Sequence, residues 1–351
     1  MATTPNPIYD QMHAKSVQMD TISDGYIKNV AFVSLRISLM SFFRTAKSLN
    51  SYMNATSIRH DMTQTEKDRA LGVVYAHEAY NAVFHFQNFM ELVIKDIRYS
   101  LTSNKKVYDQ SFADNLTKLV EGIDDGSVPT NYHFIKSHKL GLEAINRLRN
   151  DSVHSGVYIL RSEALNELFG KYALPFMVEV SKLDLFSGNR YWTFNLDNDD
   201  VHPIEDIIDE YKTNQSVNEY KVQLLKLIGA AAFDNEIFIK KKDLEEAQND
   251  IMKVGVAATY GMLYKEKVEK AEKEAKNLAN MNMMDARTCP VCHNETLVLE
   301  QDTYDSDEDG VICNYTYNVF CTQCGFKVDH YLIDRIKDTG VPIEDYSAIH
   351  A

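Results

Sequence analysis

The chain of 351 residues is long enough for about two ordinary domains, with a core that buries about three quarters of the unfolded surface. Fourteen glycines and seven prolines make up about 6% of it, half the usual share, which argues against a loop-rich all-β protein and favours helices. Because 51 acidic residues outnumber 37 basic ones, the net charge of −14 excludes a general coat for nucleic acids or anionic membranes. A polyanion could bind only at a local basic pocket.

The first residues carry no targeting pattern, since MATTPNPIYD has neither a basic segment nor an apolar stretch. The most apolar early run, Val30 to Phe43, is short and contains Arg36, so we do not expect it to span a bilayer. We therefore expect a cytoplasmic protein with no membrane segment.

The N-terminal half shows the apolar spacing of long helices. Residues 1–20 are polar. Apolar residues then recur at helical intervals over 24–50 and again over 65–101. Within the first segment, Val33–Leu39 alternates strictly between apolar and other residues, as a half-buried strand would. No turn signal bounds this run, so the helical interpretation is favoured.

The rest of the chain divides by composition. Helical spacing continues between residues 111 and 183, whereas 186–204 combines an acidic run with the β-like Tyr191–Phe194, typical of a connector with a short hairpin. Helical spacing returns over 217–280, ahead of a cysteine-containing β region. We predict a mainly α protein composed of an N-terminal arm (1–23), a helical-bundle domain (24–185), a connector (186–215), a helical segment (216–286), a small β module (287–330) and a tail (331–351).

Four of the five cysteines form two Cys-x-x-Cys pairs, Cys289 with Cys292 and Cys321 with Cys324, separated by two β-like runs. Two thiolates three positions apart wrap a knuckle that points both sulfurs at one ion, so two knuckles supply the four tetrahedral ligands that Zn²⁺ prefers. Such a closed site has no position for water or substrate. We therefore predict a structural Zn²⁺ site in a module that resembles a zinc ribbon.

Other interpretations of this module remain open. The two pairs could instead be redox motifs or reduced thiols. Cys313 lies inside the second β-like run and is interpreted as a core residue, and His293 is a reserve ligand. From Arg287 to Asp329 there are eight acidic residues and two basic ones. We therefore expect the module to pack on its own protein or on a partner rather than on nucleic acid.

A second motif, LRNDSVHSG over 148–156, places a permanently charged guanidinium near an imidazole. Cleavage of RNA by its own 2′-hydroxyl needs a base for that hydroxyl, an acid for the leaving oxygen and a cation for the phosphorane. Arginine and histidine supply these groups. Residues 131–161 also carry five Lys and Arg against two Asp and Glu, so the sequence predicts a polyanion site here.

Arg149-Asn150-x-x-x-His154, after several long helices, resembles the R-x4–6-H motif of HEPN domains. The stretch His85–Lys95 is similar to the long helix of that family, which carries an inward Glu and a Lys. The resemblance covers about residues 24–185. It implies a helical bundle that dimerises and brings Arg and His of both subunits into one cleft. Catalytic members are metal-independent endoribonucleases that leave a 2′,3′-cyclic phosphate and act as toxins or anti-phage effectors.

The resemblance assigns a role to each motif residue. Arg149 would stabilise the phosphate, His154 would act as general acid and base, and Asn150 would orient the histidine or the substrate. Glu91, on the earlier helix, is either a pocket carboxylate that positions these residues or a surface residue paired with Lys95 four positions on.

Helical geometry limits how the motif residues can meet. Asn150 and His154 lie one above the other, whereas Arg149 lies about 140° away from His154 on an unbroken helix. A break at Asn150–Ser152, all good N-cap types, would let Arg149 end one helix and His154 begin the next. Arg147 shares a face with His154, so we keep it as a candidate substrate contact.

We therefore expect an RNA-binding homodimer with a structural Zn²⁺ site and, from the resemblance, an antitoxin or other regulatory protein as partner. Family members controlled by nucleotidyltransferase antitoxins carry Tyr two residues after the His, and Gly156 occupies that position here. This difference argues against that mode of control. The alternative is a non-catalytic HEPN-like adaptor that binds a partner protein or a nucleotide through the bundle and the acidic module.

Overall fold

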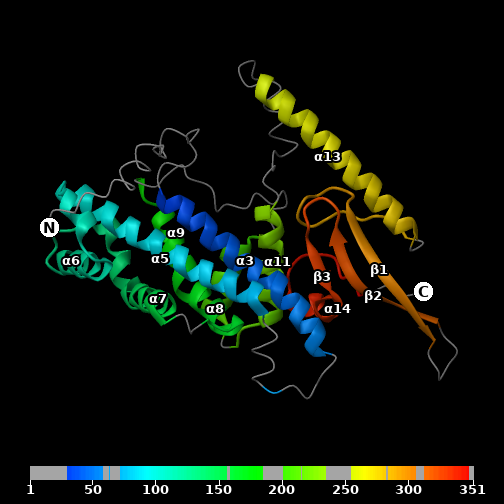
Figure 1. The fold of residues 1–351 in the computed structure, drawn as a ribbon, viewed down its shortest axis with the longest axis horizontal. Helices are drawn as coiled ribbons and strands as arrows, with labels where there is room; N and C mark the ends of the chain where they lie inside the picture. Colours follow the sequence, from blue (N-terminus) through cyan, green and yellow to red (C-terminus); the bar gives the residue numbers. More distant parts are fainter. Residues whose placement is uncertain are drawn as a thin grey trace, which may run out of the picture.

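The structure is a computed structural model. It describes residues 30–57, 63, 72–155, 159–184, 201–214, 216–234, 254–281, 284–305 and 312–347. Over these residues the protein is mainly helical with one small antiparallel sheet near the C-terminus, which confirms the predicted mainly α class with a small C-terminal β module (Figure 1). The expected arm, the hairpin at 191–194 and the start of the helix expected at 65 lie outside the described residues. Among the helices described, none has the length and apolar character needed to cross a bilayer.

Two long helices, α3 (Val30–Ser57) and α5 (Gly72–Thr102), lie side by side in the helical body (Figure 1). The favoured helical interpretation of Val33–Leu39 is confirmed. The alternation does not mark a strand, because Ser34 and Ser38 are buried in the helix contact beside Leu35 and Leu39. The Ser38 hydroxyl donates to the carbonyl of Ala82 on α5 at 2.7 Å, so this buried serine forms a hydrogen bond between the two helices.

The next helices cover α5. A short 3₁₀ turn (Lys105–Asp109) leads into α6 (Phe112–Asp124), and a second (Thr130–Tyr132) leads into α7 (Phe134–Ser155), which packs on α5. The Ser111 hydroxyl accepts from the backbone N–H of Asp114 at 3.1 Å and caps α6. The layer continues through α8 (Ser162–Leu168), a π-helical turn (Phe169–Ala173) and α9 (Leu174–Ser181).

The segment expected to be a connector contains a helix, α10 (Pro203–Thr213), which begins with a proline at its first turn and buries Ile204 and Ile207. It is followed by α11 (Glu219–Asp234), which packs on α3 so tightly that a Cβ on Gly229 would lie 2.4 Å from the Phe43 ring. This part of the chain therefore belongs to the helical body. The next described helix, α13 (Val254–Met281), contacts the first strand of the sheet, β1 (Leu297–Asp305) (Figure 1).

The sheet has the order β1 (Leu297–Asp305), β2 (Ile312–Cys321), β3 (Lys327–Asp329), with a bulge between Glu300 and Gln301. Two short helices, α14 (His330–Ile333) and α15 (Ile336–Thr339), follow, and Tyr346 is buried, so the expected tail is folded against the protein. Contacts of β3 and α14 with α3, and of α15 with α11, dock this module on the helical body.

Candidate functional site

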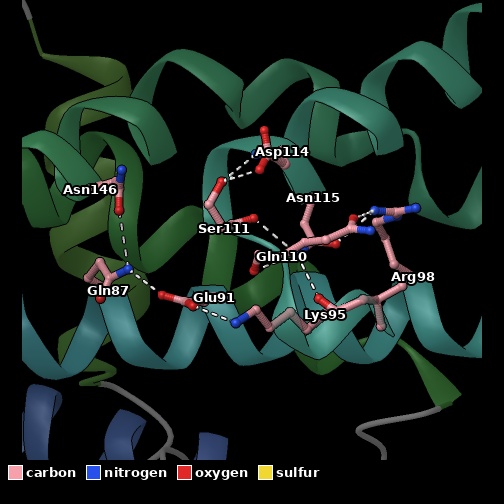
Figure 2. Close-up of polar contacts among 10 residues, drawn as sticks. Gln87, Glu91, Lys95, Arg98, Gln110, Ser111, Asp114, Asn115 and Asn146 are labelled. Atoms are coloured by element: carbon pink, nitrogen blue, oxygen red, sulfur yellow. Dashed lines mark hydrogen bonds and ion pairs between the residues drawn. The ribbon is translucent and has the colours of Figure 1, made fainter. Parts of the chain in front are cut away.

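A row of polar side chains one turn apart on α5 faces α7, and we call it the α5–α7 seam: Gln87, Glu91 and Lys95 on α5 with Asn146 on α7 (Figure 2). Glu91 accepts from Lys95 Nζ at 2.7 Å and from Gln87 Nε2 at 2.8 Å, and Gln87 also donates to Asn146 Oδ1 at 3.2 Å. Glu91 is thus paired with Lys95, which was the contact expected if it were a surface residue. Glu91 is also half-buried within the seam, as a carboxylate that lines a pocket would be.

The electrostatics of the seam keep Glu91 ionised. Burial by itself raises the pKa of this carboxyl, but hydrogen bonds from Lys95 and Gln87, together with the charges of Lys95 and Arg149, outweigh it and hold the pKa below its usual value. A carboxylate that stays charged at neutral pH is unsuited to act as a general acid. Glu91 can instead supply a fixed negative charge for the guanidinium of Arg149.

Arg149, on α7, is held against α5. Its Cζ lies 5.1 Å from the ring centre of Phe84, a cation–π contact, and its Nη1 donates to Asn150 Oδ1 at 3.0 Å. The Nε of Arg149 is buried and has no hydrogen-bond partner among the described residues. The guanidinium is therefore positioned by the fold through contacts with Phe84 and Asn150.

The break proposed within the motif is not present, because α7 runs unbroken through Ser155. Asn150 does not cap a new helix, since its side-chain oxygen accepts from Arg149 instead. Asn150 thus contacts Arg149 and lies one turn before His154, whose backbone is in the last turn of α7. The side chain of His154 lies outside the described part of the chain.

The positive charge around the motif is lower than the sequence suggests. Lys136 is ion-paired with Asp124, and Lys139 lies 3.9 Å from Glu143. Arg147 is exposed on α7, two positions from Arg149 and therefore on the opposite side of the helix. The structure does not bring Arg147 into the α5–α7 seam.

A cavity of about 480 Å³ opens beside the seam, between α5, the end of α7 and the segment that follows it. The ring of Tyr80 in its wall stacks on Phe84, with centroids 5.6 Å apart and planes 15° apart, and Phe84 carries Arg149 on its ring. Sequence reasoning missed this cavity, because it depends on how two helices distant in the chain pack. It is lined by Ala79, Tyr80, Val83, Leu148, Asp151, Ser152, Ile159 and Leu160.

The second candidate site is the cluster of Cys289, Cys292, Cys321 and Cys324, all buried, with their sulfur atoms within 4.8 Å of one another. Two of the sulfur pairs, Cys289–Cys324 and Cys292–Cys321, are each 3.6 Å apart. Tetrahedral Zn–S bonds of 2.3 Å would place sulfurs about 3.8 Å apart. The four thiols could therefore hold one metal ion, as the spacing predicted.

Backbone geometry explains how each knuckle closes. Gly325, directly after the second knuckle, has φ +72°, which confirms the tight turn expected there. His293 occupies the equivalent position after the first knuckle with φ +58°, and it is not part of the ligand cluster. The hydroxyl of buried Thr296 lies 3.2 Å from Cys292 Sγ and 3.0 Å from Cys321 Sγ.

We expect Thr296→Val to weaken metal binding by about 10- to 100-fold, because the variant keeps the shape of the side chain but removes the hydroxyl that supports two sulfurs. The measurement is a competition titration against a chromogenic chelator. Thr322→Val is the matched control, since the Thr322 hydroxyl donates to the carbonyls of Ala271 and Thr296, at 2.8 Å and 3.3 Å, and to no ligand sulfur in the contacts that the structure describes. Equal affinities of the two variants would contradict this role of Thr296.

The structure thus describes a positioned guanidinium beside a cavity on the helical body and a four-cysteine cluster at the base of the sheet. The first arrangement can bind and polarise an anionic group, and the second can cross-link the chain through a metal. Comparisons with protein family models, with curated proteins and with solved structures found no match.

Proposed function

We propose that this protein is a HEPN-type endoribonuclease that cleaves RNA through its 2′-hydroxyl, without a metal in the reaction, in anti-phage defence or a toxin–antitoxin system. One observation carries the proposal: Arg149 is held on Phe84 near Glu91 and donates to Asn150, which lies one turn before His154. The motif predicted from the sequence is therefore connected to a prepared polar seam rather than scattered over a solvated surface.

Each residue has a step in this mechanism. Arg149 Nη atoms bind the non-bridging phosphate oxygens and stabilise the charge that grows on the phosphorane. One imidazole removes the proton of the 2′-hydroxyl, and an imidazolium gives a proton to the departing 5′-oxygen. The products are a 2′,3′-cyclic phosphate and a 5′-hydroxyl. Asn150 positions Arg149 by accepting its hydrogen bond.

The unbroken helix supports a site shared between two copies of the chain. Arg149 and His154 lie about 140° apart on α7, so one helix does not direct both side chains to the same point. In a two-fold dimer, Arg149 of one subunit can face His154 of the other, and the symmetric arrangement provides both the base and the acid. The RNA phosphate would then lie at the subunit interface.

We infer that the four-cysteine cluster binds Zn²⁺ and that the ion is structural. Four thiolates satisfy the tetrahedral preference of Zn²⁺ and leave no ligand position for substrate. The ion would cross-link the two knuckles and fix β1 and β2 at their base.

The test is cleavage of an RNA pool by the purified protein in excess EDTA, with metal content measured in parallel. We expect the wild type to leave 2′,3′-cyclic phosphate ends, and Arg149→Ala and His154→Ala each to lose activity by about 10²- to 10⁴-fold. His202→Ala is the control, because His202 is exposed at the start of α10 and apart from the motif.

Two results would contradict the proposal. Equal cleavage by wild type and both motif variants would assign the activity to a contaminant or to another site. No cleavage by any of the proteins, in the presence of an intact dimer, would favour the adaptor function, in which the same surface binds a partner protein or a nucleotide.

A further inference from the structure

We propose that the β1–β2 hairpin binds an arginine-rich segment of a partner protein through an exposed surface, which we call the tyrosine face: Tyr315 and Tyr317 on β2 with Glu300 and Asp302 on β1. This inference goes beyond the proposed function, since the tyrosine face lies outside the Arg149–His154 motif. β3 pairs with β2 only over Asn318–Phe320, so β1 and β2 extend beyond it, and their turn ends project away from the helical body (Figure 1).

The two tyrosine rings form an aromatic pair on the surface. Their centres are 6.4 Å apart, and 42% of Tyr315 and 40% of Tyr317 are exposed. Thr316, between them, is buried, and its hydroxyl accepts from Gln301 Nε2 at 3.2 Å. Because successive side chains of a strand point to opposite faces, Thr316 lies on the covered side of the hairpin and the rings lie on the side that solvent reaches. Exposed tyrosines are typical of protein interfaces.

Carboxylates flank this aromatic pair. Asp302 is exposed and lies opposite Tyr315 in the register of the strands, with the tyrosine hydroxyl 3.5 Å from Asp302 Oδ2. Burial and the negative charges of Glu300 and Asp302 raise the pKa of Tyr317, so both carboxylates act on this tyrosine. Glu300 accepts from Asn318 Nδ2 at 2.7 Å. Since that amide is neutral, Glu300 keeps its negative charge beside the rings.

The charge of the hairpin determines which partner fits. Between Glu295 and Cys321 there are seven Asp and Glu and no Lys or Arg. These charges repel the phosphates of RNA, and a second copy of the hairpin would bring the same carboxylates together. A cationic side chain suits both parts of the tyrosine face, because it can lie over an aromatic ring and beside a carboxylate. Arginine fits best, since its planar group stacks on aromatic rings and binds a carboxylate through two N–H donors.

The inference is tested by fluorescence anisotropy with the full-length protein and a labelled peptide in which arginine alternates with serine. We expect this peptide to bind more tightly than the matched lysine peptide, and the matched glutamate peptide not to bind. The affinity should fall as the salt concentration rises, because the contact is exposed.

Substitutions of the tyrosines measure the contribution of the rings. Tyr317→Thr should weaken binding about 2- to 5-fold, because it removes one exposed cation–π contact and keeps a residue that favours strands. Adding Tyr315→Thr should bring the loss to about 4- to 25-fold. Tyr317→Phe keeps the ring and should bind as the wild type does. Metal content and hydrogen exchange over Leu297–Leu299 establish that each variant keeps the module folded.

A matched pair of charge variants separates the tyrosine face from the net charge of the protein. Glu300→Gln removes one charge, and its amide oxygen can still accept from Asn318. Glu121→Gln removes one charge from an exposed position on α6. We expect only Glu300→Gln to weaken binding, by about the loss expected for one ring. Equal weakening in the two variants would show that net charge alone attracts the peptide and would overturn the inference.

Three further results would overturn it. The first is no binding of the arginine peptide by the wild type, and the second is equal binding by the wild type and the double tyrosine variant. The third is RNA binding or self-association that the double variant loses, which would assign the tyrosine face to RNA or to a second copy of the chain. Cleavage of RNA should be the same in all these variants, so the outcome for this face does not decide the outcome for the proposed nuclease.

Discussion

Replacing Cys321 with serine should abolish metal binding and unfold the C-terminal module while the helical body stays folded. Cys321 Sγ accepts from the backbone N–H groups of Gln323 and Cys324, each at 3.3 Å, and lies 3.0 Å from the Thr296 hydroxyl. The serine side chain is shorter than that of cysteine, and its hydroxyl is a poorer ligand than a thiolate for a metal ion that prefers sulfur. We therefore expect the metal content to fall from one ion per chain to none.

The expected effect is large because the module is small. A unit of this size with a single three-stranded sheet rarely gains more than about 3–5 kcal/mol from its own core. A structural Zn²⁺ ion in a small module contributes about 10–16 kcal/mol at neutral pH, so its loss exceeds what the core can offset. The helical body is also held by the packing of α3 on α5 and α11, but its hydrophobic core is continuous with that of the module, so loss of the ion should weaken the body without unfolding it.

Hydrogen exchange measured by mass spectrometry distinguishes the two parts. Peptides covering Leu297–Leu299 should lose their protection in Cys321→Ser, whereas peptides covering Phe86–Ile97 of α5 should keep theirs. The chain offers a matched control in Cys313→Ser, because Cys313 lies on β2 outside both Cys-x-x-Cys pairs. Loss of metal from Cys313→Ser but not from Cys321→Ser would contradict the assignment of the ligands.

The four-cysteine cluster could be predicted residue by residue, and the reason is chemical. A pair of ligands three positions apart is fixed by the local turn, so Cys289 and Cys292 converge whatever the rest of the fold does. The contact of the Thr296 hydroxyl with the sulfurs of Cys292 and Cys321 was not predicted. It depends on the register of β1 against β2, which the sequence does not specify.

The helical site was predicted only in part, since local preferences competed with packing. Asn150, Asp151 and Ser152 favour a new helix start, yet the helix continues because Asn150 engages Arg149 and Leu148 packs against the body. The contact of Gln87 with Asn146 joins residues 59 positions apart, and no pattern in the sequence specifies it. Periodicity identified the helices, but not which polar positions would face one another.

A different buried group makes the stability of the helical body depend on pH. Lys226 on α11 is fully buried, with Nζ donating to Asn166 Oδ1 at 2.7 Å and lying 4.6 Å from the ring centre of Phe42. Burial of the ammonium lowers the pKa of Lys226 to about 7, although the negative charges of Glu219 and Glu163 oppose this shift. In the unfolded chain the same group has the ordinary lysine pKa of about 10.4.

The direction of the effect follows from proton binding. Between about pH 7 and pH 10.4 the unfolded chain holds a proton on Lys226 that the folded chain has released, so the free energy of unfolding rises with pH. The slope is at most about 1.4 kcal/mol per pH unit. Below pH 7 both states are protonated and the full cost of burying the charge is present. Burial also raises the pKa of Glu219, whose charge acts on the same ammonium.

Lys226→Met should therefore flatten the pH dependence of stability by several kcal/mol between pH 7 and pH 10. The methionine keeps the length of the side chain without a charge, and the donor lost to Asn166 Oδ1 costs about 1–3 kcal/mol at every pH in this window. Urea unfolding at pH 7, 8, 9 and 10 measures the difference between variant and wild type, which cancels the titration of other groups. Lys212→Met, an exposed position on α10, is the control and should keep the wild-type slope. A slope in Lys226→Met equal to that of the wild type would mean that Lys226 stays charged in the folded core, held there by Glu219 and the Phe42 ring.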